Sequence, residues 1–67
     1  MDKALLRSIM ALHGDTLQDL ADYLRITPQT LSAKINENGT EFKQGEIAAI
    51  RDRYQLPPEK VEAIFFA

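Results

Sequence analysis

Small polar and amide side chains are concentrated between positions 29 and 36, where the spacing of apolar residues predicts one short helix. Measured around that helix from Leu31, the residues facing away from the expected core are Gln29, Ser32, Ala33 and Asn36, flanked by Thr30 and Lys34. A glutamine amide can donate to and accept from adenine in the major groove, and an alanine methyl can lie against the thymine methyl group. The chemistry favoured is contact with base edges, for which we predict Gln29, Thr30, Ser32 and Ala33.

The chain has few of the residue types that catalysis or metal binding requires. His13 is the only histidine and the chain has no cysteine, so neither a metal-ligand set nor a nucleophile and its base can be assembled. We expect His13 to be a structural residue near a helix end. Asp19 and Asp22 lie at helical spacing without a partner group for acid–base chemistry. We therefore expect no enzyme, no metal site, no cofactor and no small-molecule ligand.

The polar face must be positioned by the segment from Thr16 to Asn36, which reads as two short helices joined by a tight turn. Thr16 can cap a helix over 17–24, with Asp19 reaching back to the Thr16 amide. Thr27 can cap a helix over 28–36, with Pro28 at its first position, where a missing N–H costs nothing. The connection is about three residues long, the length found in a helix-turn-helix, whose second helix enters the major groove.

Apolar periodicity predicts three further helices, over 2–13, 44–54 and 58–66, and no strand. In the first, Leu5, Ile9 and Leu12 form the expected apolar stripe, with Leu6, Met10 and His13 beside them, and Gly14 is expected to end the helix in a left-handed conformation. The fold class is therefore all-α: five short helices in a single domain over 1–67. We expect neither a leader segment nor a membrane span, since no apolar run approaches the necessary length.

The chain resembles the Cro/repressor-type (XRE-like) helix-turn-helix family over essentially its whole length. The shared elements are Gln18, Leu20-Ala21, Leu24, Ile26-Thr27 and the run from Thr30 to Asn36, followed by the polar loop and the fourth helix. The resemblance implies a compact lambda-repressor-like domain. It also implies a small transcriptional regulator that binds double-stranded DNA in the cytoplasm of a Gram-positive bacterium or a phage-infected cell.

The same resemblance implies a role for each matching position. Gln29, Thr30 and Ala33 would face bases, with Ser32 beside them. The residues implied or predicted to contact phosphate are Gln18, Thr27, Lys34, Asn36, Thr40, Phe42 and Lys43. Three positions depart from the family pattern: Arg25 replaces the turn glycine, Lys34 replaces a core aliphatic residue, and Pro57 precedes the fifth helix in place of a Ser or Thr cap.

The charge balance leaves a second function open. The net charge is −2, whereas a basic footprint is usual for proteins that bind nucleic acid. The alternative is a helix-turn-helix module, such as an antirepressor, that binds a protein and not DNA. Phe66 cannot face inward together with its neighbour Phe65, so we expect it to be partly exposed and to form a contact in a homodimer, which would pair two DNA half-sites.

Overall fold

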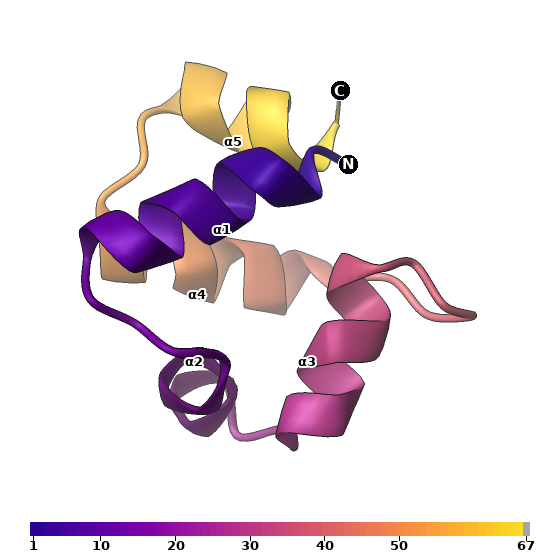
Figure 1. Cartoon of the computed structure of the whole chain (residues 1–67). Coiled ribbons are helices and arrows are strands. Elements are labelled where there is room, and N and C mark those ends of the chain that lie inside the picture. The colour runs from indigo at the N-terminus through magenta and orange to yellow at the C-terminus, as the bar shows by residue number, and fades with distance from the viewer. Residues whose placement is uncertain (67) are drawn as a thin grey trace.

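The computed structural model of the protein describes residues 1–66 and contains five α-helices, with no strand in that range (Figure 1). The helices are α1 (Lys3–Leu12), α2 (Leu17–Leu24), α3 (Pro28–Ile35), α4 (Gln44–Tyr54) and α5 (Pro58–Phe65). The all-α class is confirmed, and each helix begins and ends within one residue of its predicted position. The local signals of the sequence were therefore sufficient to place the helices.

The predicted caps at the starts of α2 and α3 are present. The Asp19 amide donates to Thr16 Oγ1 over 3.1 Å, and the Thr16 amide donates to Asp19 Oδ2 over 2.9 Å, which forms a reciprocal capping box. At α3, the Thr30 amide donates to Thr27 Oγ1 over 3.1 Å, and Pro28 occupies the first turn. These bonds satisfy amides that a helix start leaves without partners, so the first residue of each helix is set by interactions within the segment itself.

Four connections begin with a residue in the left-handed conformation: Gly14 (φ 71°), Arg25 (φ 59°), Glu37 (φ 55°) and Gln55 (φ 52°). At each one the next residue's amide donates to a carbonyl five residues earlier, as in Ile26 to Ala21 over 3.0 Å. Gly14 meets the prediction made for it. Arg25 adopts the same left-handed conformation. Glycine would adopt it without strain, whereas for Arg25 it costs on the order of 1 kcal/mol.

Replacing Gln55 by glycine is therefore expected to raise the free energy of unfolding by about 0.5–1 kcal/mol, because the strain of a left-handed side-chain-bearing residue is relieved. Thermal unfolding followed by circular dichroism measures this effect. Gln44→Gly, made at the first residue of α4 where the backbone is helical, is the matched control and should be neutral or destabilising. A Gln55→Gly protein that unfolds earlier than the parent would show that the turn carries no strain.

The core takes residues from all five helices. Its buried members are Leu6, Ile9 and Met10 of α1, Leu20 and Ala21 of α2, Leu31 and Ile35 of α3, Ile50 and Tyr54 of α4, and Ile64 of α5. Ala21 is fully buried, which fits a point where α2 and α3 pack closely. The expectation for Leu12 was wrong, because its side chain is 83% exposed. The apolar stripe of α1 instead runs through Leu6 and Met10, with Leu5 only partly buried.

The five helices are arranged in two parts that α4 joins (Figure 1). α1 and α5 pack side by side, and α4 packs against α5. The Asp2 amide donates to the Ile64 carbonyl over 2.7 Å, which ties the start of α1 to the end of α5. α2 and α3 pack against each other at the opposite end of the molecule, and the loop between α3 and α4 projects from the side where both termini lie. α3 therefore stands at one end, with one face not covered by other helices.

A polar cluster anchors the segment before α2 to the end of α4. Arg53 donates to Asp15 through Nε over 2.6 Å and through Nη2 over 2.8 Å, and the Tyr54 hydroxyl donates to Asp15 Oδ2 over 2.6 Å. The Arg53 guanidinium also lies 4.7 Å above the centre of the Tyr23 ring of α2. The His13 ring packs on Tyr54, with ring centres 4.9 Å apart. The cluster thus holds together three segments: the loop before α2, α2 itself and the end of α4.

The charges of this cluster stabilise one another. Hydrogen bonds from Arg53 and then from Tyr54 lower the pKa of Asp15 to about 2, against the opposing effect of burial. The bond from Arg53 to Asp15 raises the pKa of Arg53, and burial together with the bond to Asp15 raises the pKa of Tyr54. Asp15 and Arg53 therefore both carry their charges, and the Tyr54 hydroxyl keeps the proton that it donates, throughout the neutral pH range.

Candidate nucleic-acid interface

The outer face of α3 forms the floor of an open depression of about 390 Å³. The residues that line it are Leu17, Pro28, Gln29, Ser32, Ala33, Asn36 and Asn38. Three of the four residues predicted to contact bases, Gln29, Ser32 and Ala33, are therefore brought together in one concave surface. Thr30 is exposed on the same helix but does not line the depression. The helical spacing alone accounts for this grouping.

Gln29 is the most available hydrogen-bonding group on this face. It is exposed in the first turn of α3, and within residues 1–66 its side-chain amide has no intramolecular partner. Ser32 and Ala33 are half-buried and offer a hydroxyl and a methyl group at low steric bulk. The Thr30 hydroxyl accepts a hydrogen bond from the Thr27 hydroxyl over 2.9 Å. This face can therefore place the free side-chain amide of Gln29, beside small groups, against the flat polar edge of a ligand.

The residues predicted to contact phosphate are scattered around this face, and several already have partners. Gln18 is exposed in the first turn of α2 and donates to Asp22 Oδ1 over 2.7 Å. Thr27 is exposed but uses its hydroxyl in the cap of α3. Asn36 is exposed at the end of α3, where its amide donates to the Ser32 carbonyl over 3.0 Å. A phosphate contact from Gln18 or Asn36 would replace or share an intramolecular hydrogen bond.

The three predicted residues of the α3–α4 loop have different environments. Lys43 is exposed at the start of α4 and is the only one of the three with a free charged group at the surface. Thr40 is half-buried in the loop. Phe42 is turned toward the interior, where its ring meets the Phe65 ring edge-on with centres 5.5 Å apart. Phe42 can therefore offer only its backbone to a ligand at this face.

Lys34 is corrected by the structure. We expected it to flank the exposed face and to reach phosphate, but the residue is only 5% exposed. Its ammonium donates to Glu46 Oε1 over 3.0 Å and to the Glu41 carbonyl over 3.2 Å. The four-carbon stem of lysine can cross apolar surface and deliver the charge to a polar partner beyond it. Lys34 thus occupies a core position of α3, and its ammonium binds Glu46 within the protein.

Two cations that sequence reasoning did not single out border the α3 face. Lys3 of α1 donates to Asn36 Oδ1 over 3.3 Å. Arg7, one turn further along α1, lines a depression together with Leu17 and Ile35. Their spacing of four residues places both on one side of a helix, which is a signal available in the sequence. The position of this side beside α3 depends on how α1 packs, so the sequence pattern alone does not indicate it.

Most of the carboxylates near this region are engaged. Asp15 is paired with Arg53, Asp19 caps α2, and Asp22 accepts from Gln18. Glu37 pairs with the terminal ammonium of Met1 over 3.0 Å. Glu41 is exposed in the loop, and within residues 1–66 its carboxylate takes part in no ion pair. The acidic balance of the chain is therefore less concentrated on the α3 face than its sequence indicates.

Comparisons with known proteins find no matching family model, no matching curated protein and no matching solved structure. Among residues 1–66, no group of three acidic or histidine side chains is placed to hold a metal ion. No helix within the described range has the length and apolar character that crossing a membrane requires. A function for this chain is therefore inferred from its own residues and geometry.

Proposed function

We propose that this protein is a sequence-specific DNA-binding transcriptional regulator of the Cro or repressor type. In this proposal α2 and α3 act as a helix-turn-helix within a lambda-repressor-like domain, and α3 enters the major groove of double-stranded DNA. The observation that carries it is the exposed face of α3, where Gln29 has a free amide beside the small groups of Ser32 and Ala33. Such groups match the donor and acceptor pattern of base edges.

The surrounding charges support the same docking. Lys3, Arg7 and Lys43 lie on two different segments, the first two along α1 and the third at the start of α4. Cations placed beside a recognition helix contact phosphates and fix its register, while the helix itself reads sequence. Because Asp15 and Glu37 are each paired with a cation, their charges oppose this docking only weakly. Occlusion of a promoter by the bound protein would then regulate transcription.

Selection of binding sites from random duplex DNA at about 50 mM salt, repeated at about 200 mM, tests the proposal. Enrichment of a short motif whose affinity falls with salt would support it, and a palindromic motif would report two copies on one site. Failure to retain any DNA at the lower salt concentration would contradict it. That outcome would favour the alternative of a protein-binding module, which the net charge of −2 keeps open.

Two substitutions should separate base reading from phosphate contact. Gln29→Ala is expected to weaken binding by about 1–3 kcal/mol at one base position and to relax selectivity there, whereas Lys43→Ala should weaken binding to all sequences alike and reduce the salt slope by about 1. Gln55→Ala and Lys60→Ala are the matched controls, since both residues are exposed at the end of α4 and on α5. Identical effects of Gln29→Ala and Lys43→Ala across a randomised DNA pool would refute this division of roles.

A further inference from the structure

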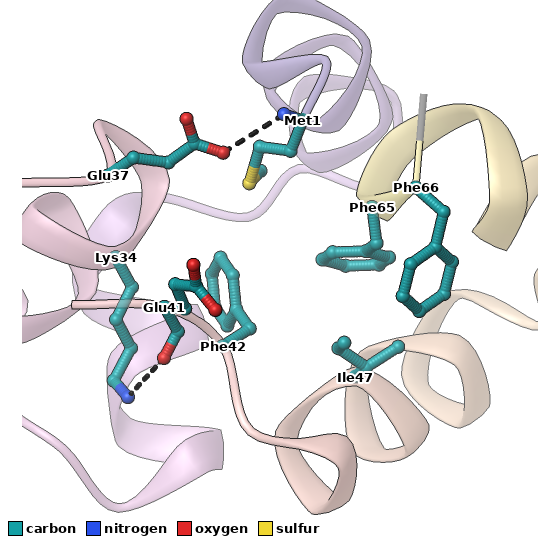
Figure 2. Close-up of a pocket in the computed structure, with 8 residues that line it drawn as sticks. All are labelled: Met1, Lys34, Glu37, Glu41, Phe42, Ile47, Phe65 and Phe66. Atoms are coloured by element: carbon teal, nitrogen blue, oxygen red, sulfur yellow. Dashed lines mark hydrogen bonds and ion pairs between the residues drawn. The ribbon is translucent and has the colours of Figure 1, made fainter.

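A second concave surface lies on the side of the molecule where the termini meet the α3–α4 loop. It is a cleft of about 210 Å³, and none of its lining residues lines the depression on α3. Figure 2 shows its walls: Met1 above, Phe42 on the loop side, Ile47 of α4 below, and Phe65 and Phe66 on the α5 side. A ligand here would leave the outer face of α3 accessible.

The walls of this cleft suit one large apolar side chain. Phe42 and Phe65 meet edge-on and hold each other in place. The Phe66 ring is 62% exposed and stands beside Phe65 at the open side of the cleft (Figure 2). A cavity of about 150 Å³ is large enough to hold a benzene ring, so a space of 210 Å³ can accept a phenyl or leucyl group.

The charge around the cleft is negative. The terminal ammonium of Met1 is paired with Glu37, and the ammonium of Lys34 is paired with Glu46. Both cations that line the cleft are thus paired, and the Glu41 carboxylate remains, directed toward the space between Met1 and Phe42 (Figure 2). A positive charge adjacent to an inserted apolar group would therefore be attracted to this mouth, whereas phosphate would be repelled.

A second copy of the chain fits this surface poorly. A two-fold interface uses the same patch on both subunits, so a dimer through this cleft would bring two Glu41 carboxylates, one from each copy, into one interface. The whole chain carries a net charge of −2. Its cations Lys3 and Lys43 do not line the cleft. Charge complementarity thus favours a different, basic partner over the homodimer expected for Phe66 from the sequence.

We propose that this cleft is a docking site for a partner polypeptide that inserts one large apolar side chain and places a neighbouring Lys or Arg beside Glu41. The site depends on residues 41–42 and 65–66 and on no residue of the α3 depression, so it stands whether or not α3 reads DNA. A protein that binds here would contact the same loop that presents Lys43 to phosphate. Occupation of the cleft can therefore influence any ligand held by that loop.

Selection of random-sequence peptides displayed on phage, with the whole protein as the target, tests this site. The selected peptides are expected to share a large apolar residue next to Lys or Arg. The consensus peptide, added to isotope-labelled protein, is expected to shift the amide NMR signals of residues 37–42 and 65–66. Absence of enrichment, selection of acidic or purely apolar peptides, or shifts confined to other residues would each overturn the proposal.

Two exposed substitutions keep the test independent of folding. Phe66→Ser and Glu41→Gln are each expected to weaken the consensus peptide by about tenfold. Leu12→Ser and Glu59→Gln remove an exposed large apolar side chain and an exposed carboxylate elsewhere, and they should alter binding by no more than about twofold. Equal losses in the control variants would overturn the site. A dimer seen in sedimentation equilibrium and abolished by Phe66→Ser would instead assign the cleft to a second copy.

Discussion

Asp15→Ala is expected to lower the free energy of unfolding by about 2–4 kcal/mol, because it leaves three donor groups on two buried or half-buried side chains without an acceptor. Asp15 receives the Nε and Nη2 groups of Arg53 and the hydroxyl of Tyr54. Tyr54 is a buried core residue with an exposed fraction of 4%, so its hydroxyl has little access to water when Asp15 is removed. A domain of this size has a total stability near the lower end of about 5–15 kcal/mol, so the loss is a large part of the whole.

Urea unfolding at neutral pH, followed by circular dichroism, measures this loss. Asp52→Ala is the matched control: its carboxylate is 65% exposed and pairs with Arg51 on the same helix. A surface pair of that kind contributes at most about 1 kcal/mol, so the control should remain close to the parent protein. If the two variants were equally stable, the Asp15 cluster would contribute no more than an exposed ion pair.

The same cluster gives the fold a dependence on acid pH with a definite sign. The pKa of Asp15 is lowered from 3.8 to about 2, so the unfolded chain takes up the proton first as the pH falls. The stabilisation is fully present above pH 3.8 and is lost as the pH approaches 2. We expect this group to account for about 1–2 kcal/mol of the acid destabilisation. Asp15→Asn should flatten the stability profile in that interval.

The helices and their caps were predictable because they depend on residues close together in the chain. Thr16 and Thr27 find their amide partners three residues later, and Gly14 ends α1 by its own backbone conformation. Each of these interactions is complete within one turn of helix. The grouping of Gln29 and Ala33 in one depression follows from the helical period in the same way.

The errors and omissions all involve partners distant in the chain. The predicted stripe of Leu5, Ile9 and Leu12 overlaps at Ile9 with the residues that are actually buried, and only the packing of α1 against the other helices decides which stripe faces inward. Asp15 and Arg53 are 38 residues apart, so no local pattern indicates that they meet. Lys3 reaches the end of α3 only because α1 crosses beside it.

Lys34 is the clearest case of a tertiary contact overriding a local expectation. Its position in α3 is a core position, and its residue type is that of a surface residue. The conflict is resolved by Glu46, 12 residues later, whose carboxylate receives the ammonium at 3.0 Å. Burial by itself would raise the pKa of Glu46, but the Lys43 amide and the Lys34 ammonium more than offset it, so the pKa is lowered.

Removal of Glu46, the partner of Lys34, is the second substitution for which we expect a large loss of stability. Glu46→Ala should lower the free energy of unfolding by about 3–5 kcal/mol, since it leaves a buried ammonium with only a carbonyl acceptor. Side-chain exposures of 6% for Lys34 and 16% for Glu46 give the ammonium little access to water. Lys34→Met, which keeps the length of the apolar stem and removes the charge, should be neutral within about 1 kcal/mol. Urea unfolding of both variants measures the difference.

Glu46 also accepts a hydrogen bond from the Lys43 amide over 2.8 Å at the start of α4. The loss of this hydrogen bond must therefore be separated from the loss of the ion pair with Lys34. Lys34→Met combined with Glu46→Ala retains the loss of this cap, worth about 1 kcal/mol, and removes the buried charge. The double variant should therefore be more stable than Glu46→Ala alone. If α3 binds DNA as proposed, the same Lys34→Met protein should retain the parent affinity for DNA, whereas Lys43→Ala should not. Equal losses would mean that the Lys34 ammonium leaves Glu46 to contact phosphate, and that the internal pair exists only in the free protein.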